Sequence, residues 1–288
     1  MAGPVLRIAT MSAAEVEFAV QLAADEGWNP GLHDGPAFHA ADPDGFLIGY
    51  LDGEPIGCIS AVSYPGHFGF IGLYIVVPHH RSSGYGIQLW NAAMQRLAGH
   101  NIGLDGVLAQ QDNYRRSGFR MAYSNIRFER SGVLAHAPAA AGGSLELAAA
   151  ADVDFSRILE YDRSAFPAAR EPFLRHWLTQ PDSRALACID GTALRGYGVI
   201  RKCRRGFKIG PLFADDPESA AVLYRGLCRD IPAEQPVYLD IPEVNAAGLS
   251  LAAMYGMQQV FGTARMYTGE FPQIPLERVF GVTTFELG

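Results

Sequence analysis

Six residues, Arg81 to Gly86, form the stretch of this sequence whose residue types and spacing point most directly to chemistry. They read Arg-Ser-Ser-Gly-Tyr-Gly and stand between an apolar, β-branched run and a segment with helical spacing of apolar residues. Glycine has no Cβ, so the backbone can turn tightly and an anion can approach its N–H groups. A helix that begins near Ile87 adds the positive end of its dipole. The pattern predicts a pyrophosphate site, with an ordinary strand-to-helix turn as the alternative.

Two familiar phosphate-binding patterns do not fit this loop. A dinucleotide-binding fingerprint needs a third glycine where this sequence has Leu89. A P-loop needs a lysine directly after its last glycine, and the lysines of this chain, Lys202 and Lys208, stand in the other half. The predicted anion site therefore belongs to neither class.

Composition and charge exclude other classes of function. The 288 residues are 49% hydrophobic and 18% charged, which suits two folded domains. The net charge is −7 and neither half is basic, so we expect no nucleic acid and no anionic membrane as partner. The one basic cluster, Arg201 to Lys208, is expected to be a solvated hairpin. No apolar run approaches the ~20 residues of a membrane-spanning helix.

The cysteines and histidines indicate neither a metal site nor a disulfide framework. The four cysteines are scattered, and the eight histidines have no ligand spacing. We expect no metal. Because no signal-peptide pattern opens the sequence, reduced thiols in a cytoplasmic protein are expected.

The order of predicted elements recurs in the two parts of the chain. Each part reads as a strand, a helical segment, a hairpin, a further strand, a helix and more strands. The hairpins turn at Asp52-Gly53 and at Asp190-Gly191. An alanine- and glycine-rich segment separates the parts. We therefore predict two copies of one mixed α/β unit, at residues 1–132 and 146–288, with a linker at 133–145.

The combined pattern of the first part resembles the GNAT acetyltransferases. In that family an Arg-x-x-Gly-x-Gly loop follows an apolar strand, and a Tyr-x-x-x-Gly-Phe sequence follows the next strand; here they are Arg81–Gly86 and Tyr114–Phe119. The match covers about residues 5 to 130. The resemblance implies a central, mostly antiparallel sheet flanked by helices, with acetyl-CoA as co-substrate.

The resemblance also assigns residues to coenzyme A, position by position. The backbone of the strand before the loop, at Ile75, Val76 and Val77, would pair with the pantetheine arm. Ser82 departs from the family, since many members have glycine there, and the segment before Tyr114 is short. The residues that would wrap the pyrophosphate are Arg81, Ser82, Ser83, Gly84, Tyr85, Gly86 and Ile87.

The second part resembles the degenerate domain of tandem proteins of the YitH-like type. Its loop position reads Phe-Ala-Asp-Asp-Pro-Glu-Ser-Ala, which has no glycine pair. Asp215 and Asp216 would repel a pyrophosphate. We therefore expect one acetyl-CoA site, in the first part. The second part is expected either to close over the acceptor site or to hold the first part rigid.

Attack of an amine on a thioester sets three chemical requirements. A backbone N–H such as that of Val76 would polarise the acyl carbonyl. The departing thiolate needs a proton, a role that the resemblance gives to Tyr114, with a packing aromatic as the alternative. The acceptor ammonium must also lose a proton, and no carboxylate lies in residues 70–77. The candidates for this base are Glu26, Asp34 and Asp105, followed by His33.

The stretch Glu26 to Gly31 is a candidate for the acceptor site. A helix should end at Gly27, which leaves Trp28 and Asn29 in the loop that borders the acceptor pocket in this family. Trp28 would wall the pocket, and Glu26 would hold a cation. We predict Trp28, Asn29 and Asp105 as acceptor-binding residues. A helix-capping glycine beside a packing tryptophan is the alternative.

Two classes of function remain open from the sequence. The first is an acetyl-CoA-dependent N-acetyltransferase that acts directly on an amine of a small-molecule or amino-acid-like acceptor. The second is a non-catalytic acyl-CoA-binding or regulatory protein, which the missing strand carboxylate and the degenerate second part would suit. Tyr114 favours the enzyme. We expect a monomer or a homodimer.

Overall fold

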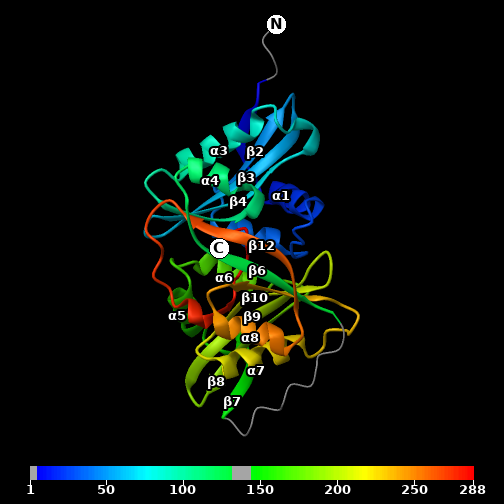
Figure 1. Ribbon diagram of the computed structural model, residues 1–288, viewed down its shortest axis with the longest axis vertical. Coiled ribbons are helices and arrows are strands. Elements are labelled where there is room, and N and C mark those ends of the chain that lie inside the picture. Colours follow the sequence, from blue (N-terminus) through cyan, green and yellow to red (C-terminus); the bar gives the residue numbers. More distant parts are fainter. Residues whose placement is uncertain (1–4, 132–143) are drawn as a thin grey trace.

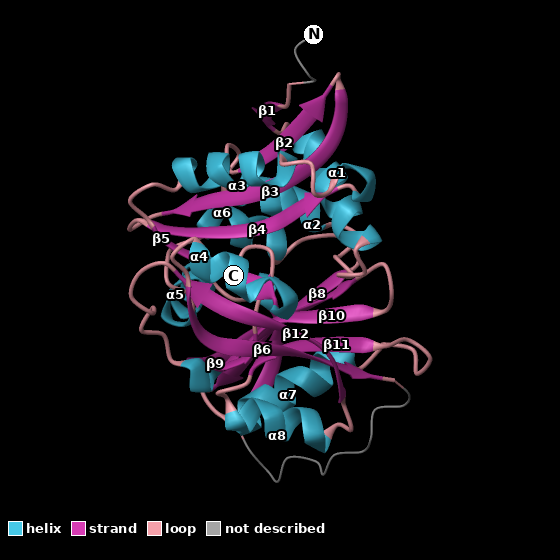
Figure 2. Ribbon diagram, turned by 45° about the horizontal axis from the view of Figure 1, so that its top comes forward, coloured by secondary structure: helices cyan, strands magenta, loops and turns pink. Residues whose placement is uncertain are grey.

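The helices and strands follow the predicted order closely, and both halves use the same plan (Figures 1 and 2). The computed structural model describes residues 5–131 and 144–288. The first half contains β1 (Arg7–Thr10), α1 (Ala13–Asp25), α2 (Asp34–Ala41), β2 (Phe46–Leu51), β3 (Glu54–Tyr64), β4 (Phe68–Val76), α3 (Tyr85–Arg96), β5 (Asn101–Val107), α4 (Gln111–Arg116) and β6 (Arg120–Arg130). The second contains β7 (Leu145–Ala149), α5 (Phe155–Ala165), α6 (Glu171–Trp177), β8 (Ser183–Asp190), β9 (Ala193–Lys202), β10 (Phe207–Ala214), α7 (Pro217–Cys228), β11 (Val237–Pro242), α8 (Ala246–Met254), β12 (Gln258–Tyr267) and β13 (Val279–Gly281).

The two halves exchange their last strands. In the described residues a 13-stranded sheet has the order β1-β2-β3-β4-β5-β12-β6-β11-β10-β9-β8-β7, with β13 paired to β10. Strand β12 of the second half thus pairs with β5, and β6 of the first half pairs with β11. One mixed sheet joins the two predicted domains, whose bounds stay a prediction. The predicted linker, 133–145, lies outside the described residues except for its last two.

Features that depend on neighbouring residues agree with the sequence. Ser12 followed by Glu15 predicts a capping box and a helix from about Ala13 to Asp25, and α1 has these bounds. The Ser12 backbone N–H donates to the Glu15 carboxylate at 2.7 Å, as a capping box requires. Asp52 and Gly53 have φ values of 52° and 92° in the hairpin turn. Helix α2 was not predicted, because its short sequence lacks a helical apolar pattern. It is fixed by packing against α6 of the second half.

The basic cluster Arg201–Lys208 lies in a hairpin as predicted, but the prediction that it is solvated is wrong for its two ends, since only Lys202, Arg204 and Arg205 are exposed. Arg201 is buried, with its Nε 2.8 Å from Asp34 Oδ1, and the Lys208 Nζ donates to the Asn29 carbonyl at 2.8 Å. The charge pattern alone could not show that acceptors in the first half cover both ends. The cluster is therefore part of the contact between the halves.

The sheet of the first half is covered on both faces. Helix α1 packs on one face with Leu73 and Ile75 of β4, and the second half packs on that same face. Helix α3 packs on the other face, beside Tyr74 and Val76. Figure 1 shows the C-terminus in the middle of the molecule, between the two halves. In the described part of the chain no helix is long and apolar enough to cross a membrane.

Candidate active site

The parallel strands β4 and β5 separate before they end. They pair from Phe68↔Asn101 to Ile71↔Leu104, yet β4 continues to Val76 and β5 to Val107. At the point of separation the register of β4 against β3 shifts, and Leu73 has a φ of 46°. This left-handed conformation costs a non-glycine residue about 1–3 kcal/mol, and such strain is concentrated at functional sites. Beyond Ile71, β4 has no strand partner on the side of β5 among the described residues.

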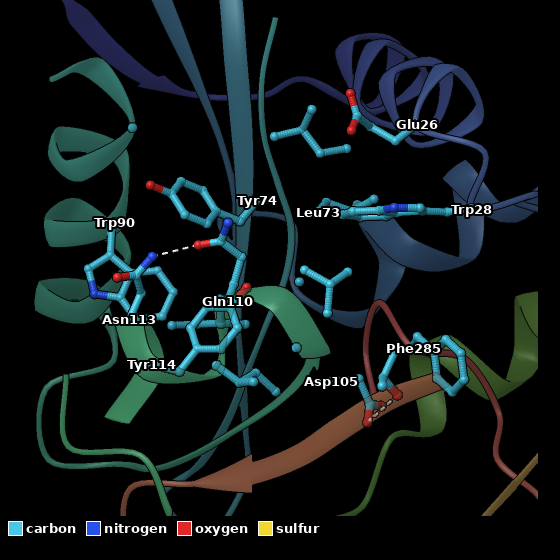
Figure 3. A pocket seen from close by; sticks show the side chains of 18 of the residues that line it. Glu26, Trp28, Leu73, Tyr74, Trp90, Asp105, Gln110, Asn113, Tyr114 and Phe285 are labelled. Atoms are coloured by element: carbon cyan, nitrogen blue, oxygen red, sulfur yellow. Dashed lines mark hydrogen bonds between the residues drawn. The ribbon is translucent and has the colours of Figure 1, made fainter. Parts of the chain in front are cut away.

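A cavity of about 680 Å³ occupies the opening between β4 and β5. Its volume is typical of small-molecule sites. Figure 3 shows Tyr74, Trp90 and Tyr114 on one side of the strand, and Trp28 with Glu26 on the other. The cavity therefore has lining residues on both sides of the sheet, next to α3 and α4 on one side and next to α1 on the other.

The predicted anion loop joins β4 to α3. Gly84 and Ser82 have φ values of 82° and 63°, so Ser82 adopts a conformation that a glycine would adopt without strain. Helix α3 begins at Tyr85, two residues before the predicted start, with Gly84 as its N-cap. No side chain of the described residues caps this end. The first N–H groups of the helix therefore remain available to an anion.

Arg81 connects the loop to the end of α1. Its Nε donates to the Val76 carbonyl at 2.7 Å, and its Nη2 contacts the Glu26 carboxylate. Both side chains are partly exposed at the cavity rim. Among the predicted cofactor residues, the cavity is lined by Ile75, Val76, Arg81, Ser82, Gly86 and Ile87. Val77, Ser83, Gly84 and Tyr85 lie outside the lining.

Tyr114 lies in the short helix α4 and packs its ring on Gly106 of β5. A Cβ at Gly106 would approach that ring more closely than real Cβ atoms approach any neighbour, so the glycine makes room for it. Burial raises the pKa of Tyr114 to about 12, and the nearby Tyr74 adds to this rise. The Tyr114 hydroxyl therefore keeps its proton at neutral pH.

Tyr74 brings a second hydroxyl group to the cavity and was not predicted as a site residue. It lies in an apolar strand, where its sequence context indicates a core aromatic residue. Its hydroxyl oxygen lies 2.7 Å from the position of a Cβ at Gly86, and its ring centroid lies 5.5 Å from that of Trp90. Burial raises the pKa of Tyr74 as well. Two protonated phenols thus share the α3 side of the cavity.

The loop after α1 contributes one of its two predicted residues to the cavity. Trp28 lines the cavity, and its carbonyl accepts from Arg127 Nη1 at 2.9 Å. Asn29 lies outside the lining, because its side-chain amide is bonded to Arg205. Its Nδ2 donates to the Arg205 carbonyl at 2.9 Å, and its Oδ1 accepts from the Arg205 N–H at 2.8 Å. Asn29 thus fastens this loop to the second half.

Asp105 reaches the cavity but is held by a buried ion pair. Its Oδ2 lies 2.6 Å from Arg265 Nη2, and its Oδ1 lies 3.0 Å from Arg265 Nε. Asn125 Nδ2 donates to the same carboxylate at 2.8 Å. Because Arg265 comes from the exchanged strand β12, this pairing could not be predicted from the sequence. Both oxygens of the Asp105 carboxylate are thereby engaged by Arg265.

The other two candidate bases lie away from the cavity lining. Asp34 is buried beneath Arg201 and also accepts the Gly31 N–H at 2.7 Å. His33 Nε2 lies 3.1 Å from an oxygen of Asp182 in the second half. Both side chains join the halves together. In the described residues no group of three or more His, Cys, Asp or Glu could hold a metal ion.

Comparison with known proteins decides the family. A model described as the Acetyltransferase (GNAT) family matches residues 14–119, and one described as an Acetyltransferase (GNAT) domain matches residues 158–281. The chain is a tandem GNAT acyltransferase. The predicted resemblance and fold are thereby confirmed, and the non-catalytic alternative is set aside.

Relatives of this tandem GNAT acyltransferase match it over nearly its whole length. It is 26% identical over 277 residues to holothin acyltransferase of Pseudoalteromonas sp. (strain SANK 73390), covering 96% of this chain and 92% of that protein. A Pyrococcus horikoshii crystal structure, proposed to be an acetyltransferase, has a TM-score of 0.81 at 23% identity, with 98% and 96% of the chains covered. The tandem GNAT protein from the clavulanic acid biosynthesis pathway has a TM-score of 0.66 at 14% identity, covering 93% and 100%. The two structures support the fold alone.

The second half of the tandem GNAT protein lines the cavity of the first. Phe261 and Thr263 come from the exchanged strand β12, and Phe285 and Glu286 come from the C-terminal segment. None of these four residues was predicted from the sequence to belong to the site. Strand exchange is set by long-range packing, and the closing residues carry no periodic pattern or motif. The second half thus closes one side of the cavity.

The second half fills its own anion position with carboxylates. Asp216 is the N-cap of α7, where its Oδ1 accepts the Ser219 N–H at 2.8 Å. Arg195 lies 2.9 Å from Asp216 and 3.1 Å from Asp215, which also contacts Arg278. The corresponding helix end is left without a side-chain cap in the first half and is capped by Asp216 in the second.

Proposed function

We propose that this acyltransferase moves an acetyl group directly from acetyl-CoA to an amine of a small-molecule or amino-acid-like acceptor. The observation that carries the proposal is the cavity through the sheet between β4 and β5. One side adjoins the loop at 81–86 and the uncapped N-terminus of α3. The other side is walled by Trp28 and by residues of the second half. Cofactor and acceptor would enter from opposite sides.

The edge of β4 supports the predicted pantetheine contacts. Val77 N–H donates to the Ile56 carbonyl of β3 at 2.9 Å. Because backbone groups alternate in direction along a strand, the N–H and carbonyl of Val76 face β5 and the cavity. The Val76 carbonyl already accepts from Arg81 on that side. The Val76 N–H is therefore suited to polarise an acyl carbonyl.

The tyrosines support proton donation to the leaving group. Acetyl-CoA supplies a thioester carbonyl for attack and a thiolate that must be protonated. Tyr114 keeps its proton at neutral pH because burial raises its pKa to about 12, and it lies in the cavity wall. We assign it as the acid, with Tyr74 as the neighbouring hydroxyl. The loop N–H groups, with Arg81 and Ser82 beside them, would hold the pyrophosphate.

Direct transfer is favoured over a covalent cysteine route. The free cysteines of the described residues are all buried. Cys58, in β3, is the one that adjoins β4, and burial raises its pKa to about 12. Its thiol donates to the Leu73 carbonyl at 3.1 Å. A buried thiol with a raised pKa is a poor nucleophile.

The test uses purified protein, acetyl-CoA and a panel of acceptors. Calorimetry should show binding of acetyl-CoA, and thiol detection should show coenzyme A release with at least one amine. The panel should include alcohols of matching shape as controls and holothin, on which the relative at 26% identity is named to act. Release with alcohols and not with amines, or no binding of acetyl-CoA, would overturn the proposal.

A further inference from the structure

One carboxylate of the cavity belongs to the C-terminal segment and has no ion-pair partner within 4 Å among the described residues. It is Glu286, which is 4% exposed and lines the cavity. We infer that Glu286 receives the ammonium group of the acceptor and takes its proton before attack. This inference rests on the proposed function. It assigns part of the acceptor chemistry to the second half of the chain.

The segment that carries Glu286 is fastened on both sides of it. Val282 N–H donates to the Asp240 carbonyl at 2.8 Å, before Glu286. After it, the Leu287 carbonyl accepts from the Tyr64 hydroxyl at 3.1 Å. The Glu286 N–H itself donates to the Thr284 hydroxyl at 2.9 Å. These bonds hold the segment in one position, as a catalytic side chain requires.

The backbone of Glu286 touches β4 at the point where β4 leaves β5. A Cβ on Gly72 would collide with the backbone carbonyl of Glu286, so the segment and the strand can meet only at a glycine. Gly72 directly precedes Leu73, the residue in the left-handed conformation. The backbone of Glu286 is thus anchored beside the point where β4 and β5 separate.

The buried charged groups around Glu286 include more cations than other carboxylates, so a negative charge on Glu286 is balanced there. Its charge acts on Arg127, Arg201 and Lys208, the cations of the surrounding strands. Two of these have anionic partners of their own, since Arg127 pairs with Asp240 and Arg201 with Asp34. Among the described residues, Lys208 donates to two backbone carbonyls, those of Trp28 and Asn29. Three cations and three carboxylates, Glu286 included, balance one another.

The other carboxylates of the cavity are less suited to this role. Asp105 is held by Arg265, and Glu26 contacts Arg81 at the rim of the predicted anion loop. The Thr284 hydroxyl donates to Oε2 of the Glu286 carboxylate, so Oε1 can accept a further hydrogen bond. Glu286 is therefore the carboxylate best placed to accept from an ammonium.

The walls near Glu286 indicate the class of acceptor. Phe285 and Phe261 are neighbours, with ring centroids 6.4 Å apart, and Trp28 also lines the cavity. Aromatic walls beside one carboxylate suit a primary amine with an apolar or aromatic body. We therefore choose benzylamine as the probe, because it is an ammonium ion at neutral pH and carries an aromatic ring.

The proposed step balances its protons. Glu286 takes one proton from the ammonium, and the amine nitrogen then forms a bond to the acyl carbon. The carbon–sulfur bond breaks, and the thiolate receives a proton from Tyr114. The second nitrogen proton returns to the Tyr114 oxygen, and Glu286 releases its proton to solvent. The products are the amide, coenzyme A with its thiol, and one proton.

The decisive variant is Glu286→Gln, which keeps shape and hydrogen bonding but removes the base. With benzylamine, kcat should fall ~10²–10⁴-fold, the range for general-base catalysis. With aniline, which is already neutral at pH 7, the fall should be much smaller. Glu286→Asp, which keeps a carboxylate, should recover part of the benzylamine rate. Glu277→Gln, an exposed glutamate of the same segment, is the matched control and should behave like the parent.

The outcomes separate this inference from the proposed function. Equal losses with benzylamine and aniline, or no loss with either, would overturn the role of Glu286 while leaving amine acetylation intact. If the parent acetylates no amine, the proposed function fails, and Glu286 is then judged by calorimetry of benzylammonium binding with coenzyme A present. Glu286→Gln should weaken that binding at least about tenfold. Unchanged binding overturns the inference, and acetyl-CoA affinity with melting temperature checks that each variant is folded.

Discussion

Arg127 of the first half and Asp240 of the second form a two-pronged ion pair between neighbouring strands. Nε lies 2.7 Å from Oδ1, and Nη2 lies 2.8 Å from Oδ2, with side chains only 6% and 2% exposed. Arg127 also donates to the carbonyl of Trp28, which lines the cavity. The pair therefore couples the contact between the halves to the wall of the cavity.

Breaking this pair should destabilise the whole chain. In Asp240→Asn, the Arg127 charge stays buried without its counter-charge, and such losses cost about 3–5 kcal/mol. We expect the free energy of unfolding, measured with urea, to fall by that amount. The transition should remain single, because β5, β12, β6 and β11 form one continuous sheet.

The matched control is Asp230→Asn, which breaks an ion pair with Arg184. Asp230 is 66% exposed, and exposed pairs contribute about 0–1 kcal/mol. A similar loss of unfolding free energy in both variants would show that burial of the Arg127–Asp240 pair does not determine how much it contributes to stability.

The predicted pyrophosphate loop can be tested at Gly84. A Cβ there meets no heavy atom within 4 Å, but its φ of 82° strains most side chains. Asp and Asn tolerate this conformation similarly, so Gly84→Asp and Gly84→Asn differ mainly in charge. A like charge about 6 Å from a phosphate costs about 1–3 kcal/mol. The Asp variant should bind acetyl-CoA roughly 5- to 100-fold more weakly than the Asn variant, and equal affinities by calorimetry would reject the loop as the anion site.

The number of cofactor sites tests the degenerate half. Because Asp216 and Asp215 satisfy the helix end and arginines of the second half, calorimetry should give one acetyl-CoA per chain. Asp215→Gly should not change that number, since Asp216 still caps α7. A stoichiometry of two in the parent or in the variant would contradict the assignment.

Features that are determined by residues close together in the chain could be predicted from the sequence. The bounds and capping box of α1, the Asp52-Gly53 turn and the helix after Gly84 depend on residues close in the chain. Family spacing also placed Tyr114 and Trp28, and the structure brings both to one cavity. Sequence patterns were sufficient for these features because each is determined by residues that are close together in the chain.

The rest depends on partners that lie far apart in the chain. Asp105 reaches the cavity, but Arg265 that holds it is 160 positions away, on a strand of the other half. The hydrogen bond from the Lys208 ammonium to the Asn29 carbonyl likewise depends on how the two halves pack together, and so does the position of Glu286. A single sequence names neither the partner of a strand nor the path of a terminal segment. The residues that the second half contributes to the cavity were therefore outside its reach.

The proposed acid is tested by Tyr114→Phe, which removes the hydroxyl and keeps the ring on Gly106. If that hydroxyl protonates the leaving thiolate, kcat should fall ~10²–10⁴-fold. Acetyl-CoA affinity and melting temperature should barely move, because the ring packing beside Trp90 is preserved. Steady-state kinetics with the best amine of the panel, calorimetry and thermal unfolding measure the three quantities.

Two further tyrosines make the result specific. Tyr74→Phe removes the other hydroxyl of the cavity, and Tyr255→Phe removes one in the second half, where that ring stacks on Tyr224. If Tyr114 is the acid, Tyr255→Phe should turn over like the parent and Tyr74→Phe should lose far less than Tyr114→Phe. Full turnover by Tyr114→Phe would reduce Tyr114 to a packing residue. A large loss in Tyr74→Phe alone would move the proton donor to Tyr74, whose pKa burial also raises, so that it too holds its proton when the thiolate leaves.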